Sequence, residues 1–227
     1  MKKTVLYFIT FLSLINCKEA NKDSKSTQRA TNYRIKGQVF DKENIIIYLK
    51  KFEANRFQII DSTSIINNSF LFEGNSTIPK KAVLQLKNHS DHFFFILSNE
   101  KIEIALNTSQ FANSSITNSL INTKLKQIQK NSAAIYQKID YLFPQLQKAR
   151  MENDYEKLKE INTKINAIVA ENQTYLTSYI QEHPDEFIAG LLLNDLWNSP
   201  KKDSIQLTKL AKGLDPNIQK IIDFSIP

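Results

Sequence analysis

The chain contains very little cysteine and glycine. Cys17 is the only cysteine in 227 residues, so no disulfide can form within one chain. There are four glycines, and neither a GxGxxG nor a GxxxxGK[ST] pattern occurs, which argues against a phosphate-binding loop. The sequence also offers no recognisable acid–base pair. We therefore expect a protein that is not an enzyme and that holds no cofactor.

Basic residues are in excess, but they are not concentrated. The formal net charge is +7, and it would fall to +5 if a signal peptide containing Lys2 and Lys3 were removed. The lysines are spread along the chain without a dense patch interleaved with aromatic residues, so we expect no nucleic-acid partner. The hydrophobic content of 41% is sufficient for a globular core.

The N-terminus has the order of charge and hydrophobicity that is typical of secretory signals. Lys2 and Lys3 precede an apolar run of 11 residues, 5–15, which is too short to span a bilayer. A buried N-terminal helix is the alternative, but it would place both lysines beside an apolar face. We therefore expect residues 1–16 to be a signal peptide.

Cys17 follows this run in the position of a lipidated cysteine. Leu14 lies three positions before it, as in a bacterial lipobox, although Ile15 and Asn16 replace the usual small residues. Ordinary signal cleavage, which would leave a free thiol, is the alternative. We favour attachment of lipid, including palmitate, to Cys17, because a single cysteine in an exported protein otherwise needs a reason. Two or more acyl chains make such anchoring stable.

The segment after Cys17 is polar and contains no branched aliphatic residue up to Asn32. It cannot bury a core, so residues 17–32 are expected to form a flexible tether. A signal peptide, a lipidated cysteine and a tether together predict a cell-envelope lipoprotein. We expect it to be anchored to the outer membrane, on the periplasmic side or at the cell surface.

Hydrophobicity then alternates with a period of two, which is typical of strands. The segments expected to be strands are 33–39, 45–49, 57–62, 70–72, 82–86, 93–97 and 102–106. The β-branched run 45–49 is expected to be buried on both faces or bent through a core. Asn67-Asn68 is a predicted hairpin turn, because asparagine tolerates positive φ. Seven or eight short strands predict an antiparallel β-sandwich or small barrel over residues 33–115.

Several of these residues recur in the same order in a known family. The motifs are Tyr33-x-Ile-x-Gly37, Ile47-Tyr48-Leu49, Asp61-Ser62-Thr63, Ser69-Phe-x-Phe-x-Gly74, Phe94-Phe95-Ile96-Leu97 with Ile102-Glu-Ile104, and Ile116-x-Asn-Ser119-x-x-Asn122. They resemble the N-terminal domain of unknown function 4369 of Gram-negative, Bacteroidetes-type envelope lipoproteins. That family commonly has glycine where this chain has Asn118. Its domain usually precedes a thioredoxin-like (AhpC/TSA) module with a CxxC pair, and no CxxC pair occurs in this sequence.

Two short polar clusters could suggest chemistry. His89 and His92, with Asp91 between them, are potential zinc or copper ligands, but their spacing is not a recognised zinc pattern. We expect a polar turn there and no metal site. Residues 61–64 contain Asp, Ser and Thr without a neighbouring histidine. We expect them to be turn formers at the end of a strand rather than a nucleophile and its partner.

After Ser119 the apolar period changes to three and four residues. The first stripe is Leu125, Ile128, Ser132, Ile135, Ile139, Leu142, Leu146 and Ala149, and the second is Leu158, Ile161, Ile165, Ile168, Asn172, Tyr175 and Tyr179. The stripes predict two long helices joined by a short loop, hence an antiparallel helical hairpin. Each stripe could cover the other or a partner helix. Ser132 and Asn172 are polar positions that could fix the register.

The ends of the predicted helices are marked by proline and by capping residues. Pro144 is expected to kink or divide the first helix near residues 140–143. Asn153 and Glu156 have the spacing of a capping box for the second helix. Shorter helices are expected over 187–197, from Asp203 to residue 212, and from Pro216. Residues 116–227 are therefore expected to form a helical domain, which makes the protein α+β.

The function class that fits these observations best is a lipid-anchored, non-enzymatic binding or accessory module of the cell envelope. An accessory or regulatory component of a thiol–disulfide system, working through a separate thioredoxin-like partner, is the alternative that the family resemblance implies. A metal-binding protein using His89 and His92 is a third and weaker alternative.

Overall fold

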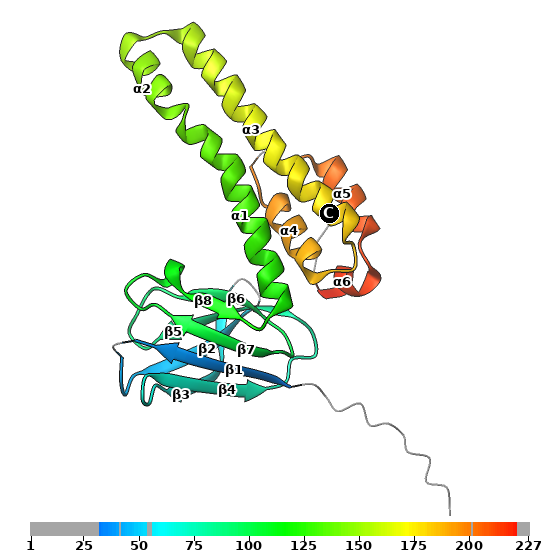
Figure 1. Cartoon of the computed structure of the whole chain (residues 1–227). Helices are drawn as coiled ribbons and strands as arrows, with labels where there is room; N and C mark the ends of the chain where they lie inside the picture. Colours follow the sequence, from blue (N-terminus) through cyan, green and yellow to red (C-terminus); the bar gives the residue numbers. More distant parts are fainter. Residues whose placement is uncertain (1–31, 41, 54–55, 201, 222–227) are drawn as a thin grey trace, which may run out of the picture. The chain divides into compact units, whose positions relative to one another are not determined.

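The computed structural model describes residues 32–40, 42–53, 56–200 and 202–221. Within these ranges, eight strands are followed by six α-helices (Figure 1). The protein is therefore α+β, as predicted. The predicted signal peptide, Cys17 and all of the predicted tether except Asn32 lie outside the described residues.

The strands form two four-stranded sheets. In spatial order, the first sheet contains β4 (Ser69–Gly74), β1 (Tyr33–Val39), β7 (Lys101–Leu106) and β8 (Ser115–Thr117), and the second contains β3 (Arg56–Ser64), β2 (Ile46–Glu53), β5 (Lys80–Leu86) and β6 (Phe93–Leu97). β1 pairs with β7 in parallel, so the expectation of purely antiparallel sheets is wrong at this pair. After β4 the chain passes through β5 and β6 of the other sheet. It then returns to the first sheet as β7, which runs in the same direction as β1.

Side chains from both sheets share one hydrophobic core, which includes Ile35 of β1 and Leu49 of β2. β2 alternates in burial: Ile47 and Leu49 are fully buried, whereas Tyr48 is only half-buried. The expectation that residues 45–49 are buried on both faces is therefore wrong. Only one face of β2 points into this core, because successive side chains of a strand point to opposite faces.

Two glycines lie opposite aromatic residues on neighbouring strands. Gly37 pairs with Phe70, and Gly74 pairs with Tyr33, across β1 and β4. A Cβ atom on Gly37 would lie 1.8 Å from the Phe70 ring, and one on Gly74 would lie 2.4 Å from the Tyr33 hydroxyl oxygen. These positions need glycine for space, which gives a physical reason for two of the sequence motifs.

The predicted turn at Asn67 and Asn68 joins β3 to β4, and both residues have positive φ, 51° and 57°. β3 continues through Ser64, so residues 61–64 lie within a strand and do not form the expected turn. The strand β8 was missed by the sequence pattern. A short 3₁₀ helix, Phe111–Asn113, precedes it.

The helices are α1 (Leu120–Asp140), α2 (Phe143–Glu152), α3 (Tyr155–Glu182), α4 (Phe187–Trp197), α5 (Ser204–Gly213) and α6 (Pro216–Ile221). The division between α1 and α2 falls where Pro144 predicted it. The predicted cap of α3 is wrong by one residue: Asp154 accepts a hydrogen bond from the Lys157 N–H at 2.9 Å. Asn153 instead ends α2 in the left-handed conformation, with φ of 52°.

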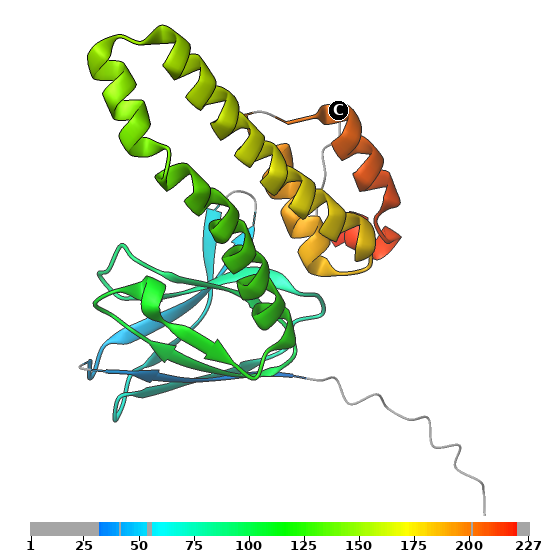
Figure 2. The ribbon, with the colours of Figure 1, turned by 45° about the horizontal axis from the view of Figure 1, so that its top comes forward.

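α1 and α3 lie side by side (Figures 1 and 2). The Ser132 hydroxyl donates to Asn172 Oδ1 at 2.7 Å, and Asn172 Nδ2 donates to the Tyr136 hydroxyl at 3.2 Å. The two polar positions within the apolar stripes therefore bond to each other across the helices.

A second hydrophobic cluster is built mainly from helices. α4 lies at its centre, where Ala189 and Leu193 are fully buried. Ile96 of β6 belongs to this cluster, so part of the second sheet packs against the helices. Among the described helices, none combines the length and apolar character needed to cross a membrane.

Candidate functional site

The start of α1 is fastened to the turn that precedes β7. Asn118 has φ of 60°, a left-handed conformation that asparagine tolerates better than most residues. Ser119 then caps α1, because its Oγ accepts the Asn122 N–H at 3.4 Å. The same hydroxyl donates to Glu100 Oε2 at 2.5 Å. This arrangement fixes the first turn of the helix beside a carboxylate.

A cleft of about 400 Å³ opens next to this turn, and we call it the junction cleft. Its apolar walls are Pro79, Leu120, Ile121, Phe187, Ile188 and Ile218, and its charged residues are Glu100, Lys124, Asp185 and Glu186. Leu120 is 68% exposed, which makes one apolar wall directly accessible. A concave apolar surface with a few polar groups is the usual form of a binding site.

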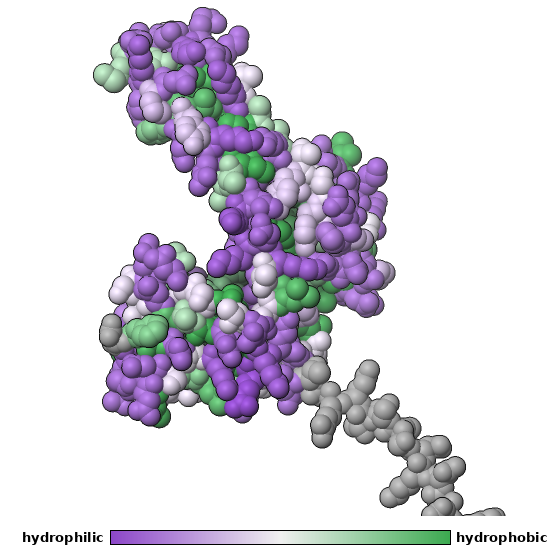
Figure 3. Space-filling model, viewed as in Figure 1, coloured by the Kyte–Doolittle hydropathy of each residue, from purple (hydrophilic) through white to green (hydrophobic). Residues whose placement is uncertain are grey.

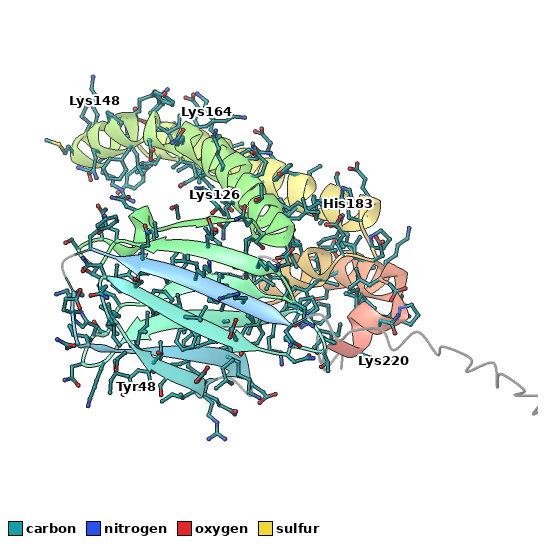
Figure 4. All side chains as sticks on the ribbon, turned by 60° about the horizontal axis from the view of Figure 1, so that its bottom comes forward. Tyr48, Lys126, Lys148, Lys164, His183 and Lys220 are labelled. Atoms are coloured by element: carbon teal, nitrogen blue, oxygen red, sulfur yellow. The ribbon has the colours of Figure 1, made fainter. Side chains whose placement is uncertain are left out.

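Glu186, which lines this cleft, bonds to polar side chains from two helices. Lys124 Nζ lies 2.5 Å from its Oε1, and the Tyr179 hydroxyl donates to its Oε2 at 2.6 Å. His183, labelled in Figure 4, follows the last residue of α3, and its Nδ1 lies 3.6 Å from Glu186 Oε1. The imidazole also packs against the Tyr179 ring, with 4.5 Å between the ring centroids. One carboxylate thus joins α1, the end of α3 and the start of α4.

The pKa values of Tyr179 and Glu186 are shifted away from neutrality. Partial burial raises the pKa of the Tyr179 phenol above its usual range, and its hydrogen bond to the Glu186 carboxylate raises it further. Burial alone would raise the pKa of Glu186. Hydrogen bonds from Lys124 and Tyr179, with the positive charge of Lys124, outweigh burial and lower it.

These shifts restrict what the cluster can do chemically. A general acid or base works best when its pKa lies near the operating pH. Here the carboxylate stays ionised and the phenol stays protonated at neutral pH. The arrangement therefore suits fixed charges and hydrogen bonds better than proton transfer.

The histidines that the sequence offered as metal ligands lie away from the junction cleft, between β5 and β6. His92 is exposed, and its ring centroid lies 5.3 Å from that of Phe57. The His89 carbonyl accepts a hydrogen bond from the Gln85 side chain at 2.7 Å. Within the part of the chain that the structure describes, no three His, Cys, Asp or Glu side chains are grouped so that they could hold a metal. Cys17, the predicted lipidation site, lies outside the described residues.

Sequence reasoning missed the residues of the junction cleft. Lys124 and Glu186 are separated by 62 positions, so no local spacing connects them. Tyr179 appeared only as a member of an apolar stripe. The one available signal was the group of polar residues directly after that stripe, where His183 and Glu186 lie between α3 and α4. That signal indicates a helix end as readily as a site.

Comparison with known proteins identifies one part of the chain. No curated protein matches the sequence. Residues 33–125 match the model of a family described as a domain of unknown function, DUF4369. The matched residues include both β-sheets and the start of α1, so they contain Ser119 and Asn122. Residues 33–125 are therefore a DUF4369 domain, the family that the sequence motifs resemble.

Proposed function

We propose that this protein is a lipid-anchored lipoprotein of the cell envelope and acts as a non-enzymatic binding or accessory module. Residues 1–16 direct export, and lipid on Cys17 holds the mature chain at the outer membrane. The junction cleft receives part of an envelope protein partner. The support for export and anchoring is the charge and hydrophobicity order of the first 17 residues.

The observation that carries the binding role is the fixed protonation of the junction cleft. Burial raises the pKa of Tyr179, and its bond to Glu186 raises it further. Bonds from Lys124 and Tyr179 outweigh the effect of burial on Glu186 and lower its pKa. A catalytic acid or base works best when its pKa lies near the operating pH, and both pKa values are shifted away from it. Apolar walls beside fixed polar groups are suited to recognition.

The scaffold proposed for this role is a β-sandwich followed by an antiparallel helical hairpin. Support for the sandwich comes from the single core to which both sheets contribute. Support for the hairpin comes from the order of contacts between α1 and α3. Asn131 bonds to Tyr175, whereas Lys138, further along α1, bonds to the earlier residue Glu171. Such a scaffold would hold the cleft residues rigidly.

Crosslinking in intact cells, followed by affinity purification, tests the binding role. Leu120→Glu places a charge on the accessible wall of the cleft. Ile205→Glu is the matched control, because Ile205 is also highly exposed and also lies in the first turn of a helix. We expect a partner captured by the wild type and the control, but much less by Leu120→Glu. Identical capture by all three proteins would contradict a role for the cleft.

A second candidate function is an accessory role in a thiol–disulfide system. The observation that favours it is the match of residues 33–125 to DUF4369. The resemblance to that family implies a functional link to thioredoxin-like modules, which such domains usually precede. In this case the thioredoxin-like protein would be a separate partner. Recovery of a CxxC-containing envelope protein in the same crosslinking experiment would support this role. Repeated capture of partners without such a pair would contradict it.

A further inference from the structure

The outer face of the first sheet carries a trough that is separate from the junction cleft. It encloses about 670 Å³, within the range of ligand-binding pockets. β1, β4, β7 and β8 present this face toward the viewer in Figure 1, and Figure 3 shows it with hydrophilic and hydrophobic residues mixed. Its floor is the sheet itself, and one side is formed by the turn between β3 and β4.

The floor consists of two rows of side chains that run across all four strands. One row is Leu71, Lys36, Glu103 and Thr117, and the other is Ser69, Gln38, Ala105 and Ser115. Each residue of a row is the direct cross-strand neighbour of the next. All eight point away from the core, because the residues that alternate with them along the strands, such as Ile35 and Ile104, are buried. The second row is made largely of small side chains, which leaves the space above it open.

The side of the trough is held in place by hydrogen bonds. Ile66 forms this side and is 61% exposed. The turn that follows it contains Asn67 and Asn68, whose N–H groups donate to the two carboxylate oxygens of Glu43 at 3.2 and 2.7 Å. The trough is therefore a preformed surface rather than a loose loop, and a ligand would not need to order it.

The charges of the trough balance each other. Lys36 and Glu103 are neighbours in the parallel register, and within the described ranges neither side chain forms an ion pair or a hydrogen bond with another residue. Hydroxyl groups from Thr63, Ser64, Ser69, Ser115 and Thr117 also line the trough, together with the amide of Gln38, and the Ser69 hydroxyl donates to the Asn67 carbonyl. The lining thus offers hydrogen-bond donors and acceptors side by side, with no net charge.

This composition limits the kind of ligand that fits. A ligand with a strong net charge would be repelled by one of Lys36 and Glu103 as well as attracted by the other, so it would gain little from the pair. A purely apolar ligand would leave both side chains without water or partners. The backbone groups of β1 and β7 are occupied on both sides by neighbouring strands, so recognition depends on side chains. Leu71 and Ile66 add exposed apolar surface against which a ring can pack.

We propose that the trough binds a neutral oligosaccharide. The ring hydroxyls of such a ligand donate to Glu103 and accept from Lys36 and Gln38. Its C–H faces pack on Leu71 and Ile66. This binding is independent of the junction cleft and of the partner proposed for it.

Isothermal titration calorimetry on the full-length, detergent-extracted protein tests this proposal. The probes are neutral hexasaccharides of α-glucose, β-glucose and N-acetylglucosamine, with an oligogalacturonate and a hexaglycine as charged and peptide comparisons. We expect at least one neutral sugar to bind and the two comparison ligands not to bind. Failure of all neutral sugars at millimolar concentration, or equal binding of oligogalacturonate or hexaglycine, would overturn the proposal.

Variants locate the binding on the trough. Ala105→Leu fills the floor, and Glu103→Gln removes an acceptor charge without changing the shape. Each should weaken sugar binding by about tenfold or more with an unchanged melting temperature. Glu73→Gln, on the same outer face but outside the trough, is the control and should bind as the wild type does. Unchanged binding by both Ala105→Leu and Glu103→Gln would place the sugar elsewhere and refute the assignment.

Discussion

The side-chain amide of Asn122 forms two hydrogen bonds to the backbone of one residue, Ile96, besides the bond from its Nδ2 to the Ser119 hydroxyl oxygen. Asn122 Oδ1 accepts the Ile96 N–H at 2.8 Å, and Asn122 Nδ2 donates to the Ile96 carbonyl at 2.8 Å. β6 is an edge strand of the second sheet. The amide thus takes the place that a further strand would occupy, and it protects a sheet edge where α1 begins. Both groups are buried, so the joint between strands and helices depends on this asparagine.

Asn122→Ala should lower the free energy of unfolding by about 1–3 kcal/mol, because it leaves the buried Ile96 N–H and carbonyl without partners. Urea denaturation followed by circular dichroism measures the change. Asn131→Ala is the control: it removes an asparagine from an exposed position of the same helix and should change stability by less than about 0.5 kcal/mol. Equal effects of the two substitutions would contradict the role given to Asn122.

Gly37→Ala should destabilise the protein by about 1–3 kcal/mol or more, because the new methyl group would overlap the Phe70 ring. Gly213→Ala should leave stability unchanged or slightly higher, since nothing lies within 4 Å of the added atom. Thermal unfolding of both variants shows whether position 37 needs glycine because space is lacking or because the backbone needs conformational freedom. If Gly37→Ala is as stable as Gly213→Ala, the packing of Phe70 over Gly37 is not the reason for glycine in this motif.

Ser132 and Asn172 should be energetically coupled, because the hydroxyl donates directly to the buried amide. A double-mutant cycle with Ser132→Ala and Asn172→Ala should give a coupling energy of about 0.5–3 kcal/mol. Pairing Ser132→Ala with the distant Asn113→Ala is the control, and those effects should add. Additive effects of Ser132→Ala and Asn172→Ala would show that the contact does not set the helix register.

Stability should be flat around neutrality and decline at both extremes of pH, in part through Glu186 and Tyr179. The lowered pKa of Glu186 adds stability above its unfolded value of 4.5, and this is lost as the pH falls through the folded value. The raised pKa of Tyr179 has the opposite sense. Its contribution is present below pH 10.0 and is lost as the pH rises above it, since the unfolded chain then releases a proton that the folded chain retains.

Melting temperatures of Tyr179→Phe and the wild type between pH 7 and 11 check the alkaline part. The substitution should lower the melting temperature at pH 7, where it removes the bond to Glu186, and should make the alkaline decline shallower. Tyr141→Phe, at an 80% exposed position, is the control and should follow the wild type. A Tyr179→Phe curve parallel to the wild type would mean that Tyr179 contributes nothing to the pH dependence.

Local patterns predicted much of the fold. Alternation and short apolar runs identified seven strands, and Asn67-Asn68 marked a turn because asparagine tolerates positive φ. Pro144 placed the break between α1 and α2, and Asp203 placed the start of α5. In each case the signal and the structural effect lie within a few residues of each other.

Features that depend on distant residues could not be predicted in this way. The parallel pairing of β1 with β7 follows from the path of the chain through the other sheet. β8 has three residues, too few to establish an alternation. The bonds of Glu186 to Lys124 and Tyr179 require α1, α3 and α4 to be packed already. The candidate site was therefore invisible in the sequence, although most elements that build it were predicted.

The proposal of a lipid-anchored envelope module is tested most directly by the intact mass of the protein extracted from membranes with detergent. The proposal predicts a chain of residues 17–227 that carries a diacylglyceryl group on the Cys17 sulfur, with or without a further acyl chain. Tandem mass spectrometry of the N-terminal peptide should place the added mass on Cys17. A chain that retains residues 1–16, or one that begins at Cys17 with a free thiol, would contradict it.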